Sequence, residues 1–197
     1  MAWAYIRTSQ LSPKLTTAQQ QNNALIITNY FRQRGWTDNA IAAMLGNMDV
    51  ESNGLNPNQF ENGFPVGTAS GGFGLVQWTP RTKYSNWAGA DWESNYDKQL
   101  QRIQYELDNP GTQWSWRPGY TPYITFEQFA VSTDTVDYLT GAFLYFYEGP
   151  LDPGASIAWR RSLANNWYTF ISGVPPTPIG NLPVWLLFKL RWQNKGR

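Results

Sequence analysis

Two stretches decide the fold, Gly46-Asn-Met-Asp-Val-Glu-Ser-Asn-Gly-Leu-Asn-Pro57 and Gly71-Gly-Phe-Gly-Leu-Val-Gln-Trp-Thr-Pro80. In the first, the apolar stripe of a predicted helix ends near Glu51. In the second, glycines lead into a short apolar, strand-like run. Between them, residues 52–74 are rich in Asn, Gly, Pro and Ser, which is typical of a long loop or short hairpins. Long loops in compact domains are usually functional, so we expect an acid at a helix end beneath a functional loop.

Helices are predicted on both sides of these stretches. Residues 17–34 show helical spacing before a glycine, and Thr37 caps a helix with four apolar residues on one stripe. Thr79-Pro80 predicts the start of a short helix to about residue 87. Others are predicted at about 95–107, after a Thr125/Gln128 capping box, at 136–147 and at 153–170. The fold class is therefore mainly α, with a small β-hairpin or long loop beside a cleft.

The chain is predicted to have three parts. Residues 1–172 form one helical domain, and residues 173–183, with four prolines and two glycines, form a stiff linker. Residues 184–197 alternate large apolar with basic side chains and are too short to span a bilayer. We expect this segment to dock on a partner subunit. Contact with a membrane interface is the less favoured alternative, and packing against its own domain is a third.

The composition limits which catalytic and metal-binding groups the chain can use. The 197 residues are 42% apolar, 16% aromatic and 15% charged, which is typical of one globular domain. The aromatic residues are more numerous than a core of this size needs, so some of them are expected to line a binding surface. There is no Cys and no His, so disulfides, thiolate nucleophiles, histidine triads and histidine-ligated metals are excluded. Carboxylates must carry any acid–base chemistry, and neither a metal nor a cofactor is expected.

Charge is distributed unevenly along the chain. All 14 acids and nine bases lie in residues 1–152, for a net charge of −5, whereas residues 153–197 hold six bases and no acid. No basic run or recognition motif accompanies these bases, so nucleic acid is not an expected partner. The first residues contain no apolar stretch typical of a secretory signal peptide. We therefore expect a protein that does not leave the cell through that route.

Glu51 is the leading candidate for proton transfer. Half-burial at a helix end against aromatic rings would raise its pKa and make it a proton donor. Asp49, two positions earlier, points to another helix face and is predicted to be a surface charge. Glu61 is the only other acid between Glu51 and Gln77. It is either a second catalytic carboxylate or a solvated loop acid.

The glycine-rich stretch offers candidate ligand contacts. Glycines before an apolar run allow the backbone to approach a ligand closely. Gln77 is suited to hydrogen-bonding a sugar hydroxyl or acetamide, and Trp78 to stacking on a pyranose ring. The alternative is a tight hairpin that buries Leu75 and Val76, and from the residues alone this alternative is favoured.

Several ordered motifs resemble a known family. Glu51-Ser52 followed by Gly72-Phe-Gly-Leu-Val-Gln-Trp-Thr-Pro80 resembles the lysozyme-like fold of goose-type lysozymes and lytic transglycosylases. With Gly35-Trp36-Thr37 and Met44-Leu-Gly-Asn-Met48, residues 17–172 are more similar to the tail lysozymes of phi29-like phages. Tyr147-Glu148-Gly149-Pro150 resembles that family's Tyr-Glu-Arg-Pro segment, with Gly149 in place of Arg.

The resemblance implies a virion muramidase that cuts the peptidoglycan glycan strand during host entry, with Glu51 as catalytic acid. It leaves open hydrolysis with Glu61 activating water, lytic transglycosylation through one Glu, or a non-catalytic glycan-binding tail protein. Glu148 is expected to be a buried, paired carboxylate beside the cleft. Tyr84, Trp87 and Trp92 belong either to sugar subsites or to the core. The residues assigned to substrate binding are Gln77, Trp78, Thr79, Tyr84, Tyr147 and Glu148.

Overall fold

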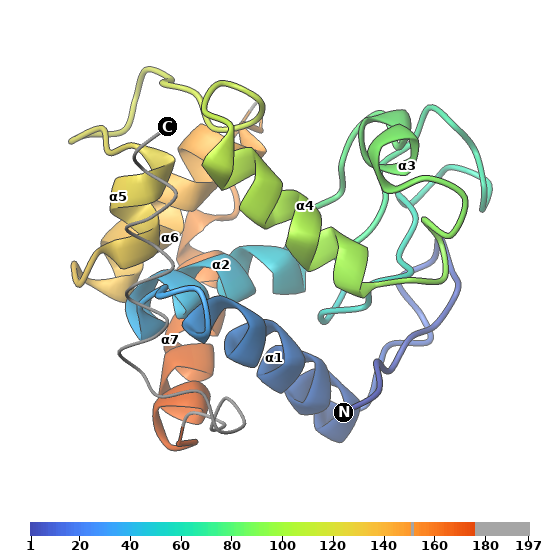
Figure 1. The fold of residues 1–197 in the computed structure, drawn as a ribbon, viewed down its shortest axis with the longest axis horizontal. Helices are drawn as coiled ribbons and strands as arrows, with labels where there is room; N and C mark the ends of the chain where they lie inside the picture. The colour runs from blue at the N-terminus through green and yellow to red at the C-terminus, as the bar shows by residue number, and fades with distance from the viewer. Residues whose placement is uncertain (151, 176–197) are drawn as a thin grey trace, which may run out of the picture.

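The computed structural model describes residues 1–150 and 152–175, and within them the fold is mainly helical, as predicted. Helix α2 (Asp38–Glu51) lies at the centre of a group of helices in Figure 1. It packs most extensively against α7 (Ile157–Ser172) and α6 (Val136–Phe143). Helices α1 (Thr17–Arg32) and α5 (Phe126–Val131) complete this group.

The long loop and the short helix α3 (Thr82–Ala88) form a second lobe beside the helical group (Figure 1). Helix α4 (Asp97–Asp108) runs between the two lobes. After α6 the chain continues as one π-helical segment, η1 (Leu144–Glu148), and stops at Gly149 in the left-handed conformation, with φ 59°. The predicted helix end at Gly149 is therefore confirmed, although its last turn is π rather than α.

Helix α2 is enclosed by its neighbours on every side. All ten residues from Ala40 to Asp49 are buried. At Gly46 the backbone of α7 comes so close that a Cβ atom would lie 2.6 Å from the Ala164 Cβ and 2.7 Å from the Arg160 carbonyl oxygen. Only glycine permits this approach without displacing α7. The close crossing brings Arg160 of α7 beside the C-terminal half of α2.

Most predicted helix starts are confirmed by side-chain caps. Thr37 accepts a hydrogen bond from the Ala40 N–H, and Thr125 with Gln128 forms the predicted capping box. The predicted start at Thr79-Pro80 is wrong. That peptide bond is cis, the Thr79 hydroxyl donates to the Gln77 carbonyl, and α3 begins at Thr82 without a side-chain cap. The last helix also begins later than predicted, at residue 157 rather than 153.

The chain between α2 and α3 is a long loop rather than a hairpin. Within the described residues it carries two isolated bridges, Thr8 with Gln59 and Phe60 with Phe73, and no named strand. The predicted strand-like run at Leu75 and Val76 forms turns, because Gly74 (φ 83°) and Gln77 (φ 47°) adopt the left-handed conformation. The side chains of Leu75 and Val76 are nevertheless buried, so this part of the hairpin alternative is confirmed although the hairpin itself is not formed.

Residues 1–13 form an N-terminal arm that is held by two buried asparagines. The Asn23 amide accepts from the Ala4 N–H (2.9 Å) and donates to its carbonyl (2.7 Å). Asn56 binds the Ile6 N–H (3.1 Å) and carbonyl (2.7 Å) in the same way. Each side-chain amide thus pairs with a backbone N–H and a backbone carbonyl of the arm, as a neighbouring strand would. These hydrogen bonds hold the arm in place.

The structure leaves the C-terminal predictions open. No helix among residues 1–150 and 152–175 combines the length and apolar character that crossing a bilayer requires. Helix α7 ends at Ser172, the last residue of the predicted domain. Most of the predicted linker and all of the segment 184–197 lie outside the described residues, so their roles remain predictions.

Candidate functional site

A cleft of about 700 Å³ opens between the end of α2 and the long loop. Its walls come from the α2 C-terminus, loop residues 59–62 and 76–79, residues 148–150 and Leu11 of the N-terminal arm. Three carboxyl side chains line it: Glu51, Glu61 and Glu148. The structure thus brings together both carboxylates proposed as catalytic and a third that was assigned to substrate binding.

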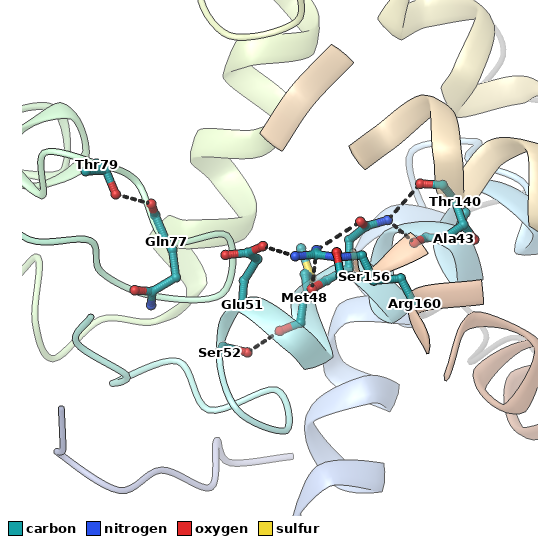
Figure 2. A network of polar contacts seen from close by, with 10 residues as sticks. Ala43, Met48, Glu51, Ser52, Gln77, Thr79, Thr140, Ser156 and Arg160 are labelled. Atoms are coloured by element: carbon teal, nitrogen blue, oxygen red, sulfur yellow. Dashed lines mark hydrogen bonds and ion pairs between the residues drawn. The ribbon is translucent and has the colours of Figure 1, made fainter. Parts of the chain in front are cut away.

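Glu51 is the last residue of α2 and is half-buried, as predicted, with a side chain 22% exposed. Ser52 ends the helix, donating its backbone N–H (2.8 Å) and its hydroxyl (2.5 Å) to the Met48 carbonyl. This double contact fixes the backbone on which Glu51 stands. The Glu51 carboxylate accepts a hydrogen bond of 2.5 Å from the Arg160 guanidinium, as Figure 2 shows.

Arg160 is a buried positioning residue for Glu51. Its guanidinium donates to the Asn47 side chain (3.1 Å) and to the Ser156 hydroxyl (3.0 Å) as well as to Glu51. Asn47 in turn donates to the carbonyl of Thr140 (3.2 Å), so α2, α6 and α7 all contribute to one network (Figure 2). Because Arg160 is only 5% exposed and bound at three of its nitrogens, its direction toward Glu51 is set by the core.

Glu148, the last residue of η1, also lines the cleft. Its Oε1 is buried and has no hydrogen-bond partner among the described residues, although the residue as a whole is partly exposed. Burial first, and the charge of Glu51 second, raise the pKa of Glu148 well above its ordinary value, while Arg160 opposes this shift in part. Burial therefore favours the neutral form of this carboxyl more than in an ordinary glutamate. Its Oε1 receives no hydrogen bond from an Arg or Tyr side chain, so the expectation of such a pairing is wrong.

Glu61 is anchored by the loop backbone. Its carboxylate accepts from the Gly72 N–H (2.7 Å), and its own N–H donates to the Gly72 carbonyl (3.0 Å). These paired contacts join the two arms of the loop at the cleft wall. Glu61 is consequently a fixed carboxylate within the cleft rather than a freely solvated one.

Gln77 and Thr79 lie on the loop side of the cleft, and Figure 2 shows Gln77 on the loop and Glu51 at the end of α2. The Gln77 amide nitrogen donates to the carbonyls of Gln59 (3.1 Å) and Gly74 (3.0 Å). The amide orientation is thus fixed, and the Gln77 backbone is held in a left-handed turn closed by the Thr79 hydroxyl. Both residues line the cleft.

Three aromatic residues assigned to substrate binding are in the core. Trp78 is 2% exposed, Tyr147 is 1% exposed and Tyr84 is fully buried. Trp78 stacks on Tyr84, with ring centroids 4.8 Å apart, and its indole N–H donates to Glu106 (3.0 Å). Stacking of these three rings on a sugar is excluded by their burial, because their faces are covered by protein. Trp78 is part of the cleft wall, whereas Tyr84 and Tyr147 lie outside its described lining.

Glu106 is the buried acceptor that organises this support. It accepts from Trp78, from Arg102 (2.8 Å) and from the Tyr147 hydroxyl. Burial raises the pKa of Glu106, and the three hydrogen bonds oppose that shift. The sequence contains no signal for this residue, because a glutamate in a helix is usually exposed and nothing near Glu106 in the sequence marks it as buried.

Asp49 is not the predicted surface charge. It is 5% exposed, accepts from the Trp167 indole N–H (3.0 Å) and lies 3.7 Å from the Lys14 ammonium group. Burial raises the pKa of Asp49, and Lys14 and Trp167 lower it in part. The prediction failed because neighbouring elements cover α2 on all sides, so the face opposite Glu51 is also interior.

The remaining candidates lie away from the cleft. Trp87 and Trp92 pack against the core, beneath the guanidinium groups of Arg102 (5.5 Å) and Arg81 (4.3 Å), and neither belongs to the described lining. No cluster of three or more acidic side chains that could hold a metal ion occurs within the described ranges. What the cleft offers chemically is carboxyl groups, one buried guanidinium, the Lys83 ammonium group and amide hydrogen bonds.

Comparisons with known proteins agree with this geometry. The model of the phage tail lysozyme family matches residues 22–171, which include the described carboxyl groups of the cleft and Arg160. The chain is 41% identical over 177 residues to morphogenesis protein 1 of Bacillus phage B103, covering 89% of this chain and 45% of that protein. The chain therefore spans less than half the length of this relative. On the family match over most of its length, the chain belongs to the phage tail lysozyme family.

Proposed function

We propose that this chain cleaves the glycan strand of bacterial peptidoglycan, as part of a phage virion that penetrates the host cell wall. The reaction is hydrolysis of the bond between N-acetylmuramic acid and N-acetylglucosamine. The observation that carries the proposal is a half-buried carboxyl, Glu51, held by the buried Arg160 at the floor of a cleft about 700 Å³ in volume. Family membership supports it, because a lysozyme domain spans the same residues.

Glu51 acts as the general acid in this proposal. In its protonated form it donates to the glycosidic oxygen while positive charge develops on the sugar ring. Proton donation leaves a carboxylate, which is the species that Arg160 binds most strongly. Because the core fixes Arg160 in advance, this stabilisation requires no rearrangement during the reaction.

Glu61 is the proposed second carboxylate. It is held in the same cleft by Gly72 and is suited to activating the water that attacks the sugar. A separation of about 6.5–9.5 Å between two such carboxyls accommodates a water and inverts the anomeric centre. If Glu51 works alone, the sugar's own hydroxyl closes an anhydro ring, which is the lytic transglycosylase outcome.

Substrate binding is assigned to the loop side of the cleft. We propose that Gln77 and Thr79 contact the sugar, with the carbonyl-anchored Gln77 amide beside the scissile bond. Glu148 and the buried Trp78 line the same cleft, whereas the buried Tyr84 and Tyr147 support its wall from the core. In this division, loop residues recognise sugars and core aromatics keep the loop in place.

Digestion of purified peptidoglycan followed by mass spectrometry tests the reaction. Hydrolysis yields new reducing muramic ends and leaves the stem-peptide crosslinks intact. Anhydro-muramic ends would show the transglycosylase reaction instead. Binding to peptidoglycan without new glycan ends would leave only a glycan-binding role.

The virion location rests on the relative, which is named a phage morphogenesis protein. We propose that residues 184–197 attach the chain to other tail proteins. Truncation after Gly173 should leave folding and glycan cleavage unchanged but prevent entry into particles. Unfolding of the truncated chain would place the segment in the core.

A further inference from the structure

Leu11 is an exposed apolar side chain in the wall of the cleft. It is 61% exposed, and among the large apolar side chains that are exposed in the described part of the chain it is the one that lines the cleft. Trp78, Tyr84 and Tyr147 are buried, so their rings are not available to a ligand. Leu11 is therefore the large apolar side chain that a ligand in this cleft can reach most easily.

The arm that carries Leu11 is joined to the loop by hydrogen bonds. The Thr8 N–H donates to the Asn58 carbonyl (3.3 Å), and the Thr8 carbonyl accepts from the Phe60 N–H (2.8 Å). Further along the arm, the Leu11 carbonyl accepts from the Asn53 side-chain amide (3.0 Å). The segment from Thr8 to Leu11 is thus attached to the loop at both of its ends, which fixes the backbone that presents Leu11.

The two attachment points lie beside the proposed catalytic carboxylates in the sequence. Asn53 follows Glu51 by two positions, and Phe60 directly precedes Glu61. Asn53 and Phe60 also line the cleft themselves. The arm therefore connects the two stretches of chain that carry these carboxylates, and Leu11 is a fixed part of the same cleft wall.

Asn53 places a polar atom beside Leu11. Its side-chain nitrogen is used by the Leu11 carbonyl, and its Oδ1 has no hydrogen-bond partner among residues 1–150 and 152–175. Asn53 is partly exposed and lines the cleft, so this oxygen is available to a donor on a ligand. An acetamide group has a methyl group and an N–H that lie on the same side of its trans amide bond. An apolar side chain next to a hydrogen-bond acceptor matches that group.

We propose that Leu11 is a substrate-binding residue that packs against the acetamide methyl group of an N-acetyl sugar, while Asn53 Oδ1 accepts from the N–H of the same group. The arm is then a preformed part of this subsite, so little order has to be gained when the sugar binds. The family match begins at residue 22, so Leu11 makes this contact from outside the matched region. This inference rests on the proposed function, because it takes an N-acetylated glycan as the substrate.

The size of the effect follows from the apolar surface of Leu11. Its side chain is exposed in the free protein and becomes covered when the sugar binds. Each buried methylene group strengthens binding about fourfold at 25 °C. L11A removes most of these carbons, and loss of roughly one or two of the buried contacts should weaken binding about 4- to 15-fold.

The test is calorimetric titration of an N-acetylglucosamine hexasaccharide into the whole chain, in the E51Q background so that the ligand is not cut. E51Q/L11A should bind about 4- to 15-fold more weakly than E51Q, with a less negative heat-capacity change, because less apolar surface is buried. E51Q/L11M keeps a large apolar side chain and should bind within about twofold of E51Q.

The matched control is V131A at the end of α5, where Val131 is 50% exposed and outside the described lining of the cleft. E51Q/V131A should bind like E51Q. Equal binding by E51Q and E51Q/L11A would overturn the proposal, and so would a hexasaccharide that E51Q does not bind. A loss confined to E51Q/N53A would assign recognition to the polar group alone and would also overturn it.

The kinetics of glycan cleavage separate this inference from the proposed function. With Glu51 present, L11A should melt like wild type, raise KM for peptidoglycan by a similar factor and leave kcat within about twofold, because the contact is equal in ground state and transition state. A fall in kcat with unchanged KM would give Leu11 a merely structural role and overturn the inference. If wild type cleaves no glycan but E51Q binds the hexasaccharide through Leu11, the proposed function fails and the binding inference holds. If wild type cleaves glycan but L11A changes neither KM nor hexasaccharide binding, the inference fails alone.

Discussion

Replacing Arg160 with methionine removes the cation that positions Glu51 while preserving much of the side-chain volume. In R160M the Glu51 carboxylate loses its 2.5 Å hydrogen bond, and the Asn47 side-chain oxygen and Ser156 hydroxyl lose their donor. Breaking a fully buried ion pair costs about 3–5 kcal/mol. Because the Glu51 side chain is 22% exposed and can reach water, we expect a loss of about 2–3 kcal/mol in the free energy of unfolding.

Urea denaturation measures this loss, and a double-mutant cycle isolates the pair. R160M combined with E51Q should be less destabilised than the sum of the two single variants, with a coupling of about 1–2 kcal/mol. Glycan cleavage by R160M should fall about 100-fold, because the acid is no longer held in its productive position.

The matched control is R161M at the next position of α7. Arg161 donates to the Asp137 carbonyl (3.1 Å) and is not part of the described cleft lining. Its replacement should change stability by about 0.5 kcal/mol or less and leave cleavage intact. A coupling below about 0.5 kcal/mol between Arg160 and Glu51, or equal losses in R160M and R161M, would refute the positioning role.

Three further variants test the supporting structure. G46A should lose about 1–3 kcal/mol of unfolding free energy in urea, since the new Cβ meets α7 at Ala164, and cleavage should fall with it. W78A should lose about 3–5 kcal/mol and melt earlier, because the indole is buried and bonded to Glu106; unchanged melting with weaker glycan binding would place the ring in the cleft instead. E148Q should gain stability over wild type as pH rises above about 4.3, the ordinary glutamate value. The reason is that the pKa of Glu148 is raised in the folded state, so wild type loses up to about 1.4 kcal/mol of stability per pH unit as pH rises toward that pKa. Thermal melts of both proteins across about pH 4–8 measure this, and a difference in melting temperature that stays constant with pH would contradict it.

Local signals in the sequence predict local structure well in this chain. Thr37 and the Thr125/Gln128 pair cap helices because a threonine hydroxyl satisfies free backbone N–H groups wherever the chain turns into a helix. The end of α2 at Glu51 and the long loop after it follow from apolar spacing and turn residues in the same way. These features depend on residues only three or four positions apart.

Contacts between distant residues could not be predicted. Arg160 lies 109 positions from Glu51, and its role depends on the close crossing of α2 and α7 at Gly46. From the sequence it was only one of six basic residues near the C-terminus. Asp49 was assigned to the surface for the same reason, since the helix that covers it is more than 100 residues away.

The aromatic residues show a second limit. Trp78 and Tyr84 have the chemistry to stack on a sugar or on each other, and composition does not distinguish these uses. In the structure they stack on each other because Glu106 provides a buried acceptor for the indole N–H. That acceptor is 28 residues from Trp78, on helix α4, whereas Trp78 lies in the loop before α3.

Glu51 is proposed to be the acid that cleaves the glycan strand. The most direct test is to digest purified peptidoglycan with wild type and with E51Q, and to count new glycan ends by mass spectrometry. We predict that wild type produces muramic ends with intact peptide crosslinks. E51Q, shown to be folded by its melting curve, should produce ends at a rate lower by at least about 100-fold. Near wild-type release of glycan ends by folded E51Q, or cleavage confined to the peptides, would contradict the account.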